Sequence, residues 1–141
     1  MAAITAEEFE QLMTEQLPFA KTMGLSVDEV NEQDVRMRAV YNQDFLRPGG
    51  TVSGPVMMGL ADAAMYLAVM AKIGPVALAV TTHLSINFLR KPEPGDVIAV
   101  ARLLKLGKRL AVGEVSLYSA SHTDDELVAH VAATYSIPPR S

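Results

Sequence analysis

The hydrophobic positions of this chain change their spacing several times, and each change marks a predicted element. Near the start, Thr5 and Glu8 are spaced as in a capping box, where each side chain accepts a hydrogen bond from the other residue's backbone N–H. Apolar residues then recur every three to four positions, which predicts an amphipathic helix over residues 6–16 that ends before Pro18.

Two strands are predicted between this helix and residue 42. The first is expected over residues 23–29. Residues 35–41 alternate between apolar and polar side chains, which is typical of a strand buried on one face. Residues 46–50 combine a proline with glycines and predict a loop.

Residues 55–73 are almost entirely apolar and predict one long helix. Pro55 suits its first turn, because the N–H that proline lacks would be unpaired there, and Gly74-Pro75 ends the helix. The segment is close to membrane-spanning length, but Asp62 near its middle would cost about 2.5–3.5 kcal/mol inside a bilayer. We therefore expect a helix surrounded by protein, and no membrane partner.

After Pro75 the hydrophobic period becomes two, which predicts four strands. In the first, over residues 78–88, one face is expected to carry Leu78, Val80, Thr82, Leu84, Ile86 and Phe88, and the other Ala79, Thr81, His83, Ser85 and Asn87. The others are expected at about 96–105, 109–119 and 126–137. A hairpin turn around Gly107 joins the middle two, and a polar turn over residues 121–125 precedes the last.

This order of elements predicts an α+β fold, in which one antiparallel sheet wraps around the long central helix. Nothing else in the chain could bury that helix. We expect residues 1–141 to form a single domain. A sheet edge without a partner strand would invite pairing with another chain, so a homo-oligomer is also expected.

Composition excludes several classes of protein. The net charge of −4 argues against nucleic acid as a partner. The chain has no cysteine, which excludes disulfides, thiolate zinc sites and cysteine nucleophiles. The first twenty residues lack the features of a signal peptide, so a cytoplasmic location is expected. The histidines His83, His122 and His130 have no metal-ligand spacing, and no metal site is predicted.

Two features could carry chemistry. Asp62 lies too deep in the apolar helix to cap it, and a buried carboxylate is costly unless it is paired, so it serves either structure or a reaction as general base. The glycine-rich residues 49–55 precede the helix, where free N–H groups can hold an anion or a developing oxyanion, although Ser53 could simply cap the helix. Gly54 and Asp62 are about 12 Å apart along the helix axis, so a shared site would need two subunits.

Four segments together resemble the PaaI-like branch of the hotdog thioesterases. They are RPGGTVSGPVMMGLADAA, AVTTHLSINFLRKPEPGD, GKRLAVGEVSL and ELVAHVAATYSI, in the family's order and spacing. The resemblance covers nearly the whole chain and implies the hotdog fold, with the sheet wrapped around the helix. It also implies dimers that pair further into tetramers, with active sites at the dimer interface.

The resemblance implies hydrolysis of an acyl-CoA thioester without a further cofactor, since coenzyme A is part of the substrate. By position, Gly54 matches the glycine whose N–H polarises the thioester carbonyl, and Asp62 matches the general base or nucleophile. Thr81 matches a residue that positions water or the carboxylate. The remaining candidates bind substrate, the basic ones through the phosphates of coenzyme A: Arg47, Ser53, Pro55, Met58, Arg90, Lys91, Lys108 and Arg109.

The helix entrance departs from the family pattern. The family usually has His-Gly-Gly where this chain has Ser53-Gly54-Pro55, and an Asn six positions earlier where this chain has Arg47. Ser53 cannot carry the charge of a histidine, Pro55 lacks a backbone donor, and Arg47 could bind a carboxylate or phosphate. These changes leave open an alternative function, an acyl-CoA-binding protein without catalysis. A hotdog hydratase is disfavoured, because no histidine lies at the matching helix positions.

Overall fold

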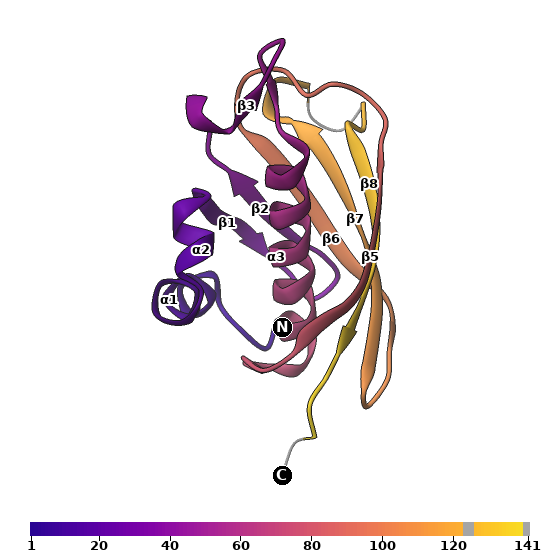
Figure 1. Ribbon diagram of the computed structural model, residues 1–141. Helices are drawn as coiled ribbons and strands as arrows, with labels where there is room; N and C mark the ends of the chain where they lie inside the picture. Colours follow the sequence, from indigo (N-terminus) through magenta and orange to yellow (C-terminus); the bar gives the residue numbers. More distant parts are fainter. Residues whose placement is uncertain (123–125, 140–141) are drawn as a thin grey trace.

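The computed structural model describes residues 1–122 and 126–139. Six strands form one antiparallel sheet that curves around the long helix α3 (Gly54–Ile73), as Figure 1 shows. In sheet order the strands are β1 (Leu25–Val30), β2 (Val35–Ala39), β6 (Val97–Leu106), β7 (Leu110–Ser119), β8 (Ala129–Ser136) and β5 (Val80–Phe88). The predicted α+β class and its hotdog arrangement are confirmed.

The N-terminal segment packs beside α3 and β1. The capping box is present at the start of α1 (Ala6–Gln16), where the Glu8 N–H donates to the Thr5 hydroxyl and the Thr5 N–H donates to the Glu8 carboxylate. Pro18 ends α1 as predicted, but it also begins a short helix that was not predicted, α2 (Pro18–Thr22). Proline fits both roles, because it cannot continue a helix and its missing N–H costs nothing in a first turn.

Helix α3 is the centre of the core. It is long and apolar enough to cross a membrane, but most of it is enclosed by the rest of the protein. Met65, Leu67 and Met70 are completely buried, and the inner faces of β2, β6, β7 and β8 pack around them. The helix therefore buries its apolar surface in protein, as expected for the core helix of a soluble domain.

Strand β5 departs from the predicted alternation. The pairing of β5 with β8 shifts its register between Thr81 and His83, which is a β-bulge. Leu84 and Ile86 pack against the core as predicted, and Thr81 also faces α3. Leu78 and Val80 were predicted on the same face as Leu84 and Ile86 and are instead 77% and 56% exposed. Val80 lies before the bulge, where one extra residue reverses which side chains face the helix, and Leu78 lies in the turn before β5.

The loop predicted at residues 46–50 is a small hairpin. The short strands β3 (Leu46–Arg47) and β4 (Thr51–Val52) pair, after a 3-10 turn η1 (Gln43–Phe45). Gly49 and Gly50 both have positive φ, which glycine adopts without strain. The polar turn predicted before the last strand begins as η2 (Ala120–His122), and residues 123–125 lie outside the described part.

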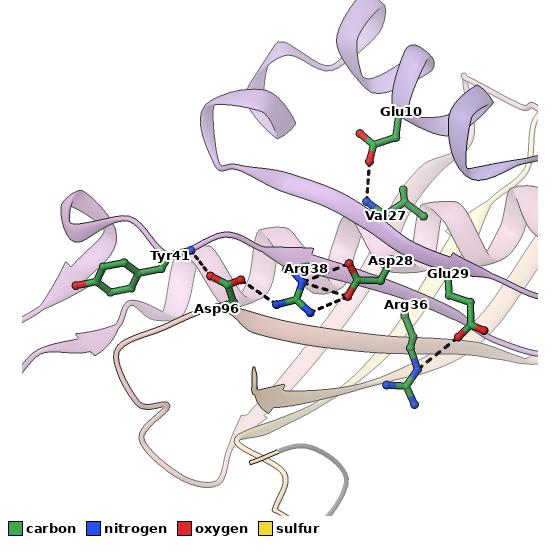
Figure 2. Close-up of polar contacts among 8 residues, drawn as sticks. All are labelled: Glu10, Val27, Asp28, Glu29, Arg36, Arg38, Tyr41 and Asp96. Carbon is green, nitrogen blue, oxygen red and sulfur yellow. Dashed lines mark hydrogen bonds and ion pairs between the residues drawn. The ribbon is translucent and has the colours of Figure 1, made fainter. Parts of the chain in front are cut away.

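The outer face of the sheet carries a network of charges, shown in Figure 2. The guanidinium of Arg38 on β2 donates to both carboxylate oxygens of Asp28 on β1 and to Asp96 before β6, at 2.8–3.3 Å. Asp96 also accepts the Tyr41 N–H at 2.7 Å. The network therefore joins two neighbouring strands and the loop that enters a third.

Candidate active site

The carboxylate of Asp62 accepts hydrogen bonds from two hydroxyl groups on neighbouring strands. The Thr81 hydroxyl on β5 donates to Oδ1 at 2.5 Å, and the Tyr135 hydroxyl on β8 donates to the same oxygen at 2.7 Å. The Tyr135 hydroxyl also lies 2.9 Å from the main-chain oxygen of Asp62. Among the described residues no donor contacts Oδ2. One oxygen therefore fixes the orientation of the carboxylate and leaves the other for a water molecule or a substrate.

A cavity of about 370 Å³ opens beside this carboxylate. It lies between α3 on one side and α2 with the start of β1 on the other. The start of β5 and the end of β8 complete its wall. Asp62 is its only charged lining residue among those described, and the rest of the wall is apolar, aromatic or hydroxyl-bearing. The cavity can therefore hold an uncharged group next to a carboxylate.

Two tyrosines form part of this wall, and they use their hydroxyls differently. The Tyr66 hydroxyl donates to the Ala77 carbonyl at 2.6 Å, whereas that of Tyr135 reaches Asp62. Their rings stack with centroids 5.9 Å apart. Burial, and then the negative charge of Asp62, raise the pKa of Tyr135 far above its usual value. The Tyr135 phenol is therefore protonated at neutral pH and acts as a donor.

Tyr135 was not predicted as a site residue. The alternation of the last strand placed it on the inner face, and its hydroxyl needed a polar partner there. The pairing of β5 with β8 sets Thr81 directly opposite Tyr135, so that both hydroxyls reach one carboxylate. That cross-strand register is the signal that the sequence alone did not provide.

The second predicted feature lies at the start of α3. Ser53 occupies the N-cap position with an extended backbone, but its side chain makes no capping hydrogen bond. Gly54 follows as the first helical residue, where a backbone N–H has no intrahelical acceptor, and Pro55 has no N–H. The ring of Phe88 at the end of β5 packs over Gly54, since a Cβ atom there would lie 3.2 Å from Phe88 Cζ.

Gly54 borders a second cavity, of about 400 Å³, that is rich in positive charge. Arg47, Arg90 and Lys91 all line it. The structure thus brings together three of the predicted substrate-binding cations with the predicted oxyanion glycine. Asp62 and Gly54 line separate cavities within one chain, in agreement with the distance expected along the helix.

The remaining predicted residues lie elsewhere. Lys108 and Arg109 are in the turn between β6 and β7, where Arg109 donates to the Ile137 carbonyl at 3.1 Å, and neither lines the cavity at Gly54. Met58 and Pro55 are exposed on α3 and line neither large cavity. A role for these four in substrate binding stays a prediction.

Two of the histidines, His83 and His130, lie on strands β5 and β8. Among the described residues, no group of three or more metal-ligating side chains comes together. His130 was predicted to stand apart from acidic residues, but its Nε2 lies 3.0 Å from Glu114 on the outer face of the sheet. His83 is exposed on β5.

The family model of the thioesterase superfamily matches residues 49–132. An inferred esterase of Halobacterium salinarum is 33% identical over 115 residues, 78% of this chain and 76% of that protein. The crystal structure of an inferred thioesterase from a Silicibacter species is 42% identical, with a TM-score of 0.87 over 99% of this chain and 95% of that chain. The E. coli PaaI protein of the phenylacetic acid degradation operon shares the fold, with 21% identity and a TM-score of 0.83 over 99% and 97% of the two chains.

These relatives agree on the class of reaction. Their names give esterases and thioesterases, which supports a hydrolase that cleaves thioesters. The family model covers more than half of the chain. The chain therefore belongs to the thioesterase superfamily, with the fold of its PaaI-like hotdog members.

Proposed function

We propose that this protein hydrolyses an acyl-CoA thioester to the free acid and coenzyme A, at a site shared by two subunits. Asp62 of one subunit acts as general base or nucleophile, and the Gly54 N–H of the partner subunit binds the developing oxyanion. Thr81 positions the carboxylate, to which it donates a hydrogen bond. A soluble enzyme of the cytoplasm is proposed, which needs no cofactor or metal because coenzyme A is part of the substrate.

One observation carries this proposal: the two halves of the site are attached to opposite ends of strand β5. Thr81 near its start bonds to Asp62, and Phe88 at its end packs on Gly54. If β5 pairs antiparallel with β5 of a second copy about a two-fold axis, the start of one strand lies beside the end of the other. Asp62 then approaches the partner's Gly54, which removes the separation found within one chain.

The two edges of the sheet support pairing through β5. At the other edge, β1 is covered by α1, and the Glu10 carboxylate accepts the Val27 N–H at 2.8 Å, which occupies a donor that a new strand would need (Figure 2). On β5, Val80 and Phe88 expose 56% and 51% of their surface. A bare edge with exposed apolar residues favours association. We propose a homodimer joined at β5, or a tetramer of two such dimers.

The proposed reaction begins at Asp62 Oδ2. This oxygen either takes a proton from a water molecule that attacks the thioester carbonyl, or attacks that carbonyl itself to form an anhydride that water then hydrolyses. In both routes the C–S bond breaks, the thiolate of coenzyme A leaves and takes up a proton, and the free acid is released. Arg47, Arg90 and Lys91 beside Gly54 are placed to bind the phosphates of coenzyme A.

The test of the oxyanion role uses two variants of one residue. Gly54→Pro deletes the N–H at a position where proline fits, because Ser53 before it is already extended at φ −70° and ψ 151°. Gly54→Ala adds a Cβ at the same place and keeps the N–H. Across short, medium, long and aryl CoA thioesters, we expect Gly54→Pro to lower kcat by about 10²–10³-fold and Gly54→Ala by much less. Equal losses in both variants would contradict the oxyanion role.

The shared site is tested by mixing subunits. Asp62→Asn and Gly54→Pro chains are each expected to be inactive alone, but a heterodimer of the two contains one site with Asp62 and Gly54 both intact. Co-expression of the two chains is therefore expected to restore hydrolysis. Continued inactivity of purified heterodimers, with wild-type subunits active under the same conditions, would show that one chain carries the whole site.

A second candidate is an acyl-CoA-binding protein without catalysis. The helix entrance favours it, because Ser53 replaces a histidine without capping the helix and Pro55 lacks an N–H. Binding of CoA thioesters by calorimetry, together with no turnover across the panel, would select this function over hydrolysis.

A further inference from the structure

We propose that Tyr135 is a positioning residue for the reaction, which holds Asp62 so that Oδ2 alone reacts. The proposal rests on the proposed function at this site. It adds a residue and a role that the sequence pattern did not assign.

The Tyr135 hydroxyl lies close to two oxygens of Asp62. Tyr135 reaches both Oδ1 and the main-chain oxygen of Asp62, at 2.7 and 2.9 Å. Thr81 donates to the same Oδ1 from the neighbouring strand. A carboxylate with two donors on one oxygen cannot turn about its χ2 angle without breaking both bonds. The oxygen that faces the reacting group is therefore fixed before the substrate binds.

The ring of Tyr135 is held firmly in place. Tyr135 is 3% exposed and lies in β8, which pairs with β7 on one side and β5 on the other. Its ring stacks on Tyr66 of α3. The position of the hydroxyl is thus set by the sheet and the helix together, with little freedom to follow the carboxylate if it moves.

Asp62 depends on hydroxyl groups for its hydrogen bonds. A carboxylate away from water is costly unless it is paired or hydrogen-bonded. The titratable residues that face this cavity are Asp62, Tyr66 and Tyr135. From α2, the segments that flank it and β1, the cavity receives only apolar side chains: Leu17, Phe19, Ala20 and Leu25. No cation lines the described wall, so the hydrogen bonds to Asp62 come from the hydroxyls of Thr81 and Tyr135.

The experiment compares Tyr135→Phe with Tyr66→Phe. Both remove one hydroxyl from adjacent, stacked rings that line the same cavity, but only Tyr135 bonds to Asp62. With a thioester that the wild type hydrolyses, we expect Tyr135→Phe to lower kcat by about tenfold or more and to change KM little, because the lost hydroxyl holds the reacting carboxylate. Tyr66→Phe is expected to lower kcat by much less.

Two results would overturn the proposal. One is a Tyr135→Phe enzyme with wild-type kcat, whatever its melting temperature. The other is an equal loss of kcat in both variants, because a general effect of the cavity wall would then explain it.

A measurement without turnover separates this proposal from the proposed function. NMR of protein with isotope-labelled aspartate observes the Asp62 carboxyl directly. We expect the carboxyl signal of Asp62 to shift in Tyr135→Phe and to stay near its wild-type position in Tyr66→Phe, and an unshifted signal in Tyr135→Phe would contradict the role of Tyr135. If the wild type hydrolyses no thioester of the panel, the proposed function fails, whereas this measurement still tests the contact.

Discussion

Asp62 and Asp96 are both partly buried carboxylates, and their neighbours give them opposite properties. Each oxygen of Asp96 accepts a donor, one from the Arg38 guanidinium and one from the Tyr41 N–H (Figure 2). Asp62 accepts donors at one oxygen only, and both are neutral hydroxyls. Asp96 is therefore paired with a cation and bonded at both oxygens, whereas among the described residues Asp62 has no cation as partner and keeps an open oxygen.

The difference lies in the cation. Hydrogen bonds with Asp28 and then with Asp96 raise the pKa of Arg38, so the guanidinium is a fixed positive charge between two carboxylates. Such a saturated network can stabilise the contact between strands but has no group left for a reaction. A partly buried carboxylate without a cation contributes less to stability and is available for chemistry.

The largest expected effect comes from the same substitution at the two positions. Asp62→Asn retains an oxygen for both hydroxyls and loses only the reactive one, so we expect kcat to fall about 10²–10⁴-fold with the free energy of unfolding nearly unchanged. Asp96→Asn should leave kcat unchanged and lower the free energy of unfolding by about 1–2 kcal/mol. Turnover and urea denaturation of both variants measure this. Loss of activity in Asp96→Asn at a temperature where it is folded would show that Asp96 also supports the reaction, and would contradict the difference between the two carboxylates.

The next effect concerns the cation itself. Arg38→Met leaves the carboxylates of Asp28 and Asp96 near each other without a counter-charge, and we expect it to lower the free energy of unfolding by about 2 kcal/mol. Arg102→Met is the control, because Arg102 on β6 is 61% exposed and its guanidinium bonds to one carboxylate, that of Glu114. The control should lose less than about 1 kcal/mol. Equal losses in denaturation experiments would show that the bonding of Arg38 adds nothing.

The smallest effect involves a third carboxylate, Glu114. Hydrogen bonds with His130 and then Arg102 hold the pKa of Glu114 below its usual value. A lowered pKa in the folded state means that the stabilisation is present at neutral pH and is lost as the pH falls through that pKa. Because Arg102 is 61% exposed, we expect a contribution below about 1 kcal/mol. Glu114→Gln should therefore lose slightly less stability than the wild type as the pH falls from neutral to below the usual glutamate pKa of about 4.3.

Salt separates this effect from a change in packing. The contribution of Glu114 should shrink at high ionic strength, because exposed charges are screened. If acid denaturation followed the same curve in wild type and Glu114→Gln, the ion pairs on this face would have no role in stability.

Much of the fold could be predicted because its cause is local. The spacing of apolar residues placed α1 and α3, and the alternation in the later strands placed the inner face that packs on α3. The small helix α2 and the hairpin of β3 and β4 were missed, because short elements carry little periodic signal. That residues 1–141 form one domain stays a prediction.

The sequence by itself determined that a carboxylate lies inside an apolar helix and that a free N–H begins that helix. It could not determine what holds the carboxylate. The bulge in β5 turns Thr81 toward α3, and the register with β8 brings Tyr135 opposite, although the two residues are far apart in the chain. The physical reason is that side-chain period follows from the backbone of one strand, whereas register depends on how two strands and the helix against their inner face pack together. The tertiary structure alone therefore decided which oxygen of Asp62 is left open.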